Sequence, residues 1–277
     1  MVSMFKLSNP STSDIETFHR DGYIAYPDVM CDDYREALIK EVLSADLILD
    51  FLSLSNQDRA KLDNSTRYFV RPWDDRGPLS DALIDAPLVT ALLQATVGPE
   101  YHFCHSSMNL ALRGSETVRF HQDHHHWNHE NPINLVEREK DYIQILYYPN
   151  GFTRGDRSLI AIPGSHLVSP TKDVTPDRLL AGDFDEEAGR KLEAVHLELP
   201  PGSFVYLNAR MFHGVDPKLP DSRQPFRMFL IDIFKQAGPP HRYTQEIPDE
   251  WIQKASPERL KLFSRDPWTE TCWNQTP

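Results

Sequence analysis

The sequence is poor in cysteine, in long apolar runs and in basic residues, and each shortage excludes a class of protein. Its three cysteines, Cys31, Cys104 and Cys272, are odd in number and widely spaced, which fits neither a disulfide framework nor a cysteine-rich zinc site. No stretch approaches the roughly 18 apolar residues of a membrane helix, and the first residues lack the apolar region of a signal peptide. These shortages favour reduced thiols and a cytoplasmic location, without a membrane partner.

The shortage of basic residues bears on nucleic acid. Lys and Arg number 29 against 41 Asp and Glu, which gives a formal net charge of −12. A surface of that sign repels a polyphosphate backbone, so no nucleic-acid partner is expected. With 40% hydrophobic and 25% charged residues, the composition is otherwise that of a globular protein that buries a core.

Three parts of the chain differ in pattern, and we predict that they form a single domain over residues 1–277. Residues 1–100 are mostly helical in their apolar spacing, and residues 236–277 form a Pro-rich extension. Residues 101–235 consist of short β-type runs bounded by Gly, Pro, Asn and Asp, such as DYIQILYYP and SFVYLN. Short strands without long helices between them favour a sandwich or barrel, and a jelly roll is the expected core.

The stretch HQDHHHWNH at 121–129 gathers five histidines around one carboxylate. If TVRFHQD is a strand, side-chain alternation directs His121 and Asp123 to one face and Gln122 to the other. Oxygen-activating enzymes commonly bind divalent iron through two imidazoles and one carboxylate on one face of an octahedron. His121 and Asp123 are therefore candidate metal ligands, and a third ligand is expected from a distant strand.

His213 is the candidate for that third ligand. It lies in PPGSFVYLNARMFHG, where a Pro-Gly turn starts an alternating strand and the histidine is expected to end it. Gly214 beside it lets another group approach closely, which suits a ligand. The other histidines of the cluster lack a spacing that brings them onto the face of His121. They are expected to contact substrate, to support the ligands or to lie on the surface: His124, His125, His126 and His129.

These segments resemble the phytanoyl-CoA dioxygenase-like family of iron(II)- and 2-oxoglutarate-dependent oxygenases. The resemblance runs from about residue 12 to about residue 235 and rests on four pieces in order: FHRDGYIAYPDVM at 18–30, HQD at 121–123, RSLIAIPGSHL at 157–167 and PPGSFVYLNARMFHG at 200–214. It implies a cupin-like double-stranded β-helix, mainly β with flanking helices. It further implies Fe(II) held by His121, Asp123 and His213 as the catalytic centre, with 2-oxoglutarate and O2 as co-substrates.

The resemblance also implies an arginine for the far carboxylate of 2-oxoglutarate, about eleven residues after the distal histidine. Arg223 follows that histidine by ten residues and Arg227 by fourteen. Arg227 is favoured because it lies inside the expected strand FRMFLIDIF, whereas Arg223 lies in the loop PDSRQP. Many members carry a serine two residues after the histidine, but Val215 stands here. Another donor is therefore expected, and Asn109 and Gln144 are the candidates.

The activity that the resemblance implies is hydroxylation of an unactivated C–H bond of a small organic molecule, with release of succinate and CO2. Two other classes stay open. A zinc- or manganese-dependent jelly-roll hydrolase or isomerase could use the same ligands, since ligand type alone does not select iron. A catalytically silent metal- or ligand-binding protein could keep the same fold. An arginine facing the metal pocket distinguishes the oxygenase from both. Nothing in the sequence specifies an oligomeric state.

Overall fold

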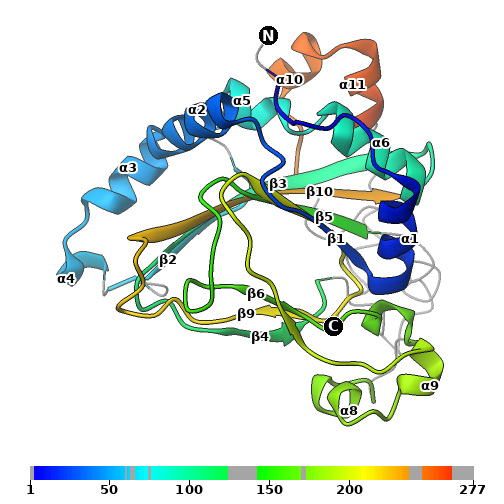
Figure 1. Cartoon of the computed structure of the whole chain (residues 1–277). Helices are drawn as coiled ribbons and strands as arrows, with labels where there is room; N and C mark the ends of the chain where they lie inside the picture. Colours follow the sequence, from blue (N-terminus) through cyan, green and yellow to red (C-terminus); the bar gives the residue numbers. More distant parts are fainter. Residues whose placement is uncertain are drawn as a thin grey trace, which may run out of the picture.

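Two antiparallel sheets face each other in the computed structural model, and a layer of helices covers the outer side of the larger sheet (Figure 1). The structure describes residues 3–59, 61–62, 66–73, 76–123, 142–169, 173–236 and 245–263. The larger sheet contains β1 (Tyr23–Tyr26), β2 (Arg67–Val70), β3 (Tyr101–Leu112), β5 (Tyr142–Tyr148), β8 (Ser203–Asn208) and β10 (Phe226–Gln236). The smaller sheet contains β4 (Val118–His121), β6 (Leu159–Ala161), β7 (Val195–His196) and β9 (His213–Val215).

The strand order is β1-β8-β5-β10-β3-β2 in the larger sheet and β4-β9-β6-β7 in the smaller one. Strands distant in the sequence therefore lie side by side, as expected of a jelly roll rather than of sequential hairpins. The predicted fold class, mainly β with flanking helices in a jelly-roll core, is confirmed. The division into a single domain over the whole chain stays a prediction.

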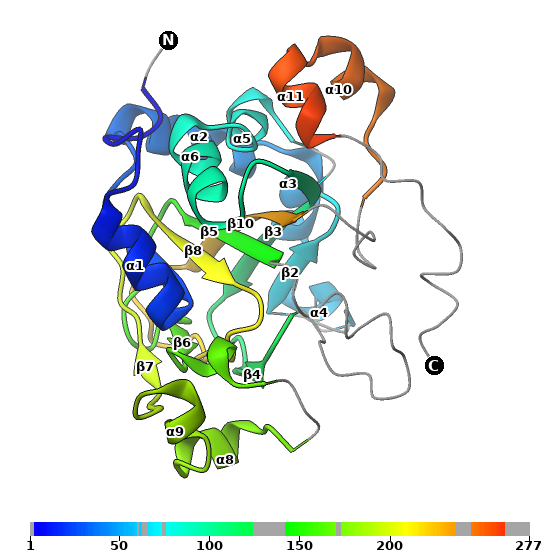
Figure 2. The ribbon, with the colours of Figure 1, turned by 90° about the vertical axis from the view of Figure 1, so that its right-hand side faces the viewer.

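Helices α8 (Pro176–Leu180) and α9 (Asp185–Ala188) lie on the side of the molecule opposite the main helical layer (Figure 2). The other helices precede β3 or follow β10: α1 (Thr12–Asp21), α2 (Asp32–Leu43), α3 (Asp46–Ser53), α4 (Asn56–Arg59), α5 (Pro78–Ala82), α6 (Pro87–Thr96), α10 (Asp249–Lys254) and α11 (Pro257–Leu262). Among the described residues before 101, six helices outnumber the two strands β1 and β2. Within the described residues, no helix has the length and apolar character that crossing a membrane requires.

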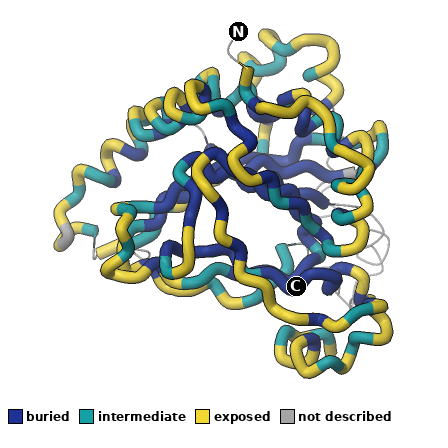
Figure 3. Tube along the Cα trace, in the orientation of Figure 1, coloured by how far each residue is buried: buried dark blue, intermediate teal, exposed yellow. Residues whose placement is uncertain are grey.

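The main core lies between the helices and the outer face of the larger sheet. In α2, the buried residues Tyr34, Leu38 and Val42 recur every fourth position, so they form one stripe on the helix surface. Beneath them β3, β5 and β8 are buried along most of their length, whereas the helices expose their outer sides (Figure 3). Burial of this apolar stripe holds the helical layer on the sheet.

The larger sheet divides its side chains between two environments because successive residues of a strand point to opposite faces. The residues of β5 that pack toward the helices are Ile143, Ile145 and Tyr147. The alternate residues of β5 face a cavity between the two sheets: Gln144, Leu146 and Tyr148. This alternation places polar groups inside the sandwich without interrupting the main core.

Two details differ from the expected strands. The strand β4 ends at His121, so Asp123 lies just beyond it. His213 does not end β8, which stops at Asn208; instead it opens β9 in the other sheet. The chain crosses between the sheets through a tight turn, in which the Asn208 side chain accepts a hydrogen bond from the backbone N–H of Arg210 at 3.0 Å. Asparagine favours such turns because its side chain bonds to nearby backbone.

Candidate metal centre and adjoining cavity

His121, Asp123 and His213 lie close together in the region of the smaller sheet where β4 ends and β9 begins. In the pairing of β4 with β9, His121 stands directly opposite His213, and their ring centroids are 4.5 Å apart. The closeness of the strands requires Gly214, because a Cβ there would lie 2.7 Å from the carbonyl oxygen of Val118. One potential ligand atom from each of the three residues lies within 4.8 Å of the others, a spacing that could hold a metal ion.

Backbone carbonyls orient both imidazoles. The Nδ1 atom of His121 lies 2.8 Å from the carbonyl oxygen of Arg119, and Nδ1 of His213 lies 3.0 Å from that of Met211. A proton on each Nδ1 leaves the lone pair of Nε2 for a metal. The Nε2 atoms face Asp123, at 3.1 Å for His213 and 3.6 Å for His121. The two rings therefore present their donor atoms to one point.

The carboxylate of Asp123 is held in its ionised form. Burial alone would raise its pKa, but the hydrogen bond and charge of His213, followed by His121 and Gln144, hold the pKa well below its usual value. The Gln144 side-chain amide donates a hydrogen bond to Oδ2 of Asp123. An ionised carboxylate fixed by a neighbouring amide is suited to binding a cation.

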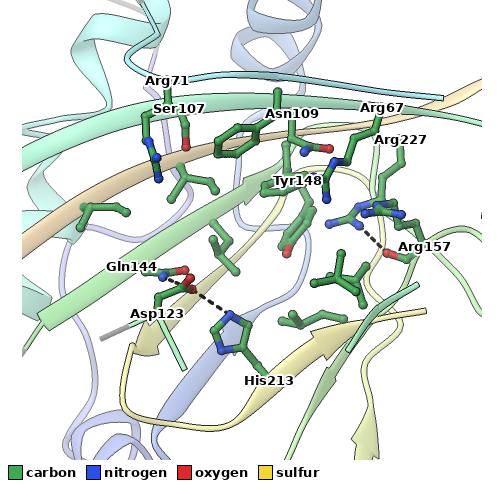
Figure 4. A pocket seen from close by; sticks show the side chains of 18 of the residues that line it. Arg67, Arg71, Ser107, Asn109, Asp123, Gln144, Tyr148, Arg157, His213 and Arg227 are labelled. Atoms are coloured by element: carbon green, nitrogen blue, oxygen red, sulfur yellow. Dashed lines mark hydrogen bonds and ion pairs between the residues drawn. The ribbon is translucent and has the colours of Figure 1, made fainter. Parts of the chain in front are cut away.

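A cavity of about 220 Å³ extends from these three residues between the sheets. At one side of it lie Asp123, Gln144 and His213, and at the other lie Arg67, Arg157 and Arg227 (Figure 4). Apolar side chains from both sheets line much of the remaining wall: Val118, Leu146, Leu159, Val215, Phe229, Ile231 and Ile233. The cavity thus joins a candidate metal site to a cluster of cations.

The two candidate arginines occupy different environments. Arg227 is 1% exposed, lines the cavity and lies with its guanidinium over the rings of Tyr148, Phe152 and Phe229 at 5.0, 5.3 and 4.5 Å. Arg223 is exposed and is not among the residues that line the cavity. Of the two candidates, Arg227 inside β10 is therefore the arginine that faces the cavity of the candidate metal site.

The candidate donors Asn109 and Gln144 both line the cavity. Gln144 bonds to Asp123, which places it beside the candidate metal ligands. Asn109 lies on β3, and its Oδ1 is buried without a hydrogen-bond partner among the described residues. The roles of both residues toward a co-substrate stay predictions. The histidines predicted to contact substrate, support the ligands or lie on the surface are outside the described residues: His124, His125, His126 and His129.

Sequence reasoning did not find Arg67 and Arg157. Arg67 belongs to β2, a four-residue strand within the part of the chain that was expected to be mostly helical. Arg157 precedes β6 in the segment RSLIAIPGSHL, which drew attention for its family resemblance and not for its arginine. A weak signal was available in RYFVR at 67–71, where three residues that favour strands stand between two arginines.

Comparison with solved structures shows the same fold at low sequence identity. The apoform of EctD from S. alaskensis has a TM-score of 0.62 and 20% identity over 90% of this chain and 86% of its own. HygX from Streptomyces hygroscopicus, with nickel and 2-oxoglutarate bound, has a TM-score of 0.61 and 14% identity over 83% and 89%. The carbocyclase SnoK from nogalamycin biosynthesis, non-heme and alpha-ketoglutarate dependent, has a TM-score of 0.60 and 15% identity over 90% and 92%.

The family is shown by the sequence itself. No curated protein sequence matches the chain. The family model described as phytanoyl-CoA dioxygenase matches residues 18–223 of the 277, a span that includes the three converging residues and every strand before β10. The chain therefore belongs to the phytanoyl-CoA dioxygenase family, as its motifs predicted.

Proposed function

We propose that the protein is an iron(II)- and 2-oxoglutarate-dependent dioxygenase that hydroxylates an unactivated C–H bond of a small organic molecule, releasing succinate and CO2. The observation that carries the proposal is that one cavity contains both His121, Asp123 and His213 and the buried Arg227. A hydrolase, an isomerase or a silent binding protein requires no such arginine. Family membership and structural relatives described as dependent on alpha-ketoglutarate support the same choice.

In this proposal His121, Asp123 and His213 would hold the metal ion. Fe(II), bound together with 2-oxoglutarate, supplies the activation of O2. The residues of the chain would position the metal and the co-substrate and shield them from solvent. His121, Asp123 and His213 present Nε2, carboxylate and Nε2 donors, and Gln144 holds the carboxylate. Arg227 binds the far carboxylate of the co-substrate through its planar fork.

The proposal includes a small-molecule substrate and a cytoplasmic location. The net charge of −12 opposes a polyphosphate partner. The cavity between the sheets combines apolar side chains with polar and charged groups, which suits a small organic molecule.

The test is O2-dependent succinate release from 2-oxoglutarate across a panel of small molecules, with Fe(II) supplied. Wild-type protein should form succinate, and one panel member should accelerate it. Asp123→Ala and His213→Ala should lose metal and succinate formation while keeping the fold, whereas His19→Ala, at an exposed histidine, should retain both. Succinate formation unchanged in either ligand variant refutes the triad. Metal binding without succinate formation in the wild type refutes the oxygenase.

A further inference from the structure

Two arginines of the larger sheet stand in one row on the face that lines the cavity. Ala111 of β3 pairs in register with Arg227 of β10 on one side and with Arg67 of β2 on the other. Neighbouring strands are about 4.8 Å apart, and the side chain between the two arginines is the methyl group of Ala111. The guanidinium groups of Arg67 and Arg227 approach the same end of the cavity (Figure 4).

A third arginine reaches the same place from the segment before β6. Arg157 is 2% exposed and has a φ of 62°, a left-handed conformation that residues other than glycine rarely adopt. Its carbonyl oxygen accepts a hydrogen bond from Nη1 of Arg227, and its own Nη1 donates to the carbonyl oxygen of Glu116. These bonds hold an unfavourable backbone conformation that directs the guanidinium toward Arg227.

A buried polar cluster braces that backbone. Nζ of Lys218 donates to Oδ1 of Asp156, the residue before Arg157, and Oγ of Ser222 donates to the same oxygen at 2.7 Å. Because Lys218 already pairs with Asp156, the carboxylate of Asp156 forms an ion pair outside the arginine cluster. Lys218, Asp156 and Ser222 therefore brace the backbone beside Arg157 without forming an ion pair with its guanidinium.

Opposite charge is scarce near the three arginines: among the described residues, Asp156 acts electrostatically on Arg227 but is paired with Lys218. None of the three guanidinium groups forms an ion pair with a carboxylate of these described residues, and each Nε is buried without a hydrogen-bond partner. Burial, followed by the charges of Arg227 and Arg67, lowers the pKa of Arg157 to about 9. Among the described residues that line the cavity, Asp123 is the sole acid, and it lies at the metal end. Arg157 and Arg227 are buried and Arg67 is half-buried, so a bound anion would offset the like charges that they bring to the cavity.

We propose that Arg67 and Arg157 join Arg227 in binding the far carboxylate of 2-oxoglutarate, an inference that rests on the proposed function. One arginine is enough to pair with one carboxylate, and this chain places three around it. The added donors replace the hydroxyl that Val215, an apolar lining residue, cannot supply. Three guanidinium groups also make the end of the cavity selective for a 2-oxo acid with a second carboxylate, because a monoanion would leave them unpaired.

Binding measured without turnover tests the inference. N-oxalylglycine, which carries both carboxylates of 2-oxoglutarate, is titrated calorimetrically into the full chain loaded with Mn(II). We expect Arg67→Met and Arg157→Gly each to weaken its Kd by about 10- to 100-fold, the loss of a charge-assisted hydrogen bond. Oxalate, which reaches the metal and has no far carboxylate, should bind all variants equally. Arg154→Met, in the same segment but exposed, is the matched control and should bind N-oxalylglycine as the wild type does.

Glycine at position 157 separates binding from folding. Since glycine adopts a φ of 62° without strain, Arg157→Gly should keep this backbone conformation and weaken N-oxalylglycine binding, whatever the lost hydrogen bond to Glu116 does to the unfolding temperature. A lower unfolding temperature with unchanged affinity would overturn the inference in favour of a structural role. Affinity within twofold of wild type in both variants would overturn it and leave the proposed function standing. A wild-type protein that binds neither N-oxalylglycine nor oxalate would overturn the proposed function as well.

Discussion

The two faces of the six-stranded sheet bury polar groups in different ways. On the outer face, beneath the helices, Asp232 pairs with Arg76 at 2.9 Å, and both side chains are 1% exposed. On the inner face, Ser107, Asn109 and Arg227 each carry a buried polar atom that has no partner among the described residues. Arg76 and Asp232 also carry buried atoms without a hydrogen-bond partner, but their opposite charges are paired with each other. Arg227 has no carboxylate partner among the described residues, and its side chain faces a cavity. A paired charge belongs to the folded core, whereas an unpaired one that faces a cavity is suited to a ligand.

This contrast can be tested on one strand. Residues of β10 alternate between the faces, so that Leu230 and Asp232 point to the helices and Phe229 and Ile231 to the cavity. Substitutions of the residues that face the helices should change the free energy of unfolding. Substitutions of the residues that face the cavity should change the affinity for the co-substrate.

The largest effect is expected at Leu230, which is 1% exposed in the main core. Leu230→Ala should lower the free energy of unfolding by about 2–5 kcal/mol, because it removes buried methyl groups and leaves a cavity. The affinity of the folded fraction for N-oxalylglycine should not change. Urea unfolding and calorimetry check the two parts, with Leu219→Ala, at a 44% exposed leucine, as the control. A loss equal to that of the control would show that the outer face does not carry the stability.

Much of the fold, and the choice of His121, Asp123 and His213 as candidate ligands, could be predicted because the sequence signals are local. Alternation and turn residues mark β3, β5 and β8, and HQD places two candidate ligands two positions apart. The crossing between sheets could not be predicted in the same way. SFVYLNARMFHG contains one nearly continuous apolar pattern, and only pairing with partners from distant parts of the chain divides it into β8 and β9.

The arginine cluster depends on still longer-range information. Arg67 and Arg227 are neighbours only because both pair with Ala111, and no local pattern specifies that register. The sequence also does not predict the left-handed backbone of Arg157, since arginine has no preference for that conformation. Sequence reasoning could choose between Arg223 and Arg227 on strand position, but it could not count how many arginines meet in one place.

A smaller effect is expected from the buried carboxylate of the outer face. Burial, only partly offset by Arg76, raises the pKa of Asp232 from 3.8 to about 6, the opposite direction to Asp123 on the cavity side. The folded state then binds more protons than the unfolded state between about pH 4 and pH 6, so this group's contribution to stability is lost as pH rises through that window.

Asp232→Asn removes this titration. The stability of the wild type relative to the variant should therefore shrink by up to roughly 3 kcal/mol as the pH rises from 4 to 6.5. Urea unfolding of both proteins at several pH values measures the difference, and the affinity for N-oxalylglycine at pH 7 should be equal in the two. If the wild type instead became more stable relative to the variant as the pH rises, the charge of Arg76 would outweigh burial. The Arg76–Asp232 pair would then be a net stabiliser.

The smallest effect is expected at Phe229, whose ring centroid lies 4.5 Å from the guanidinium carbon of Arg227. Phe229→Leu keeps an apolar side chain but removes the ring face, and a cation–π contact is worth roughly 0.5–2 kcal/mol. N-oxalylglycine should therefore bind about 3- to 10-fold more weakly, because Arg227 is less firmly aligned, whereas oxalate should bind as before. In an Arg227→Met background the same substitution should have no further effect. An equal loss in both backgrounds would show that Phe229 contacts the ligand itself, and the ring would then belong to the binding site rather than to the support of the arginine.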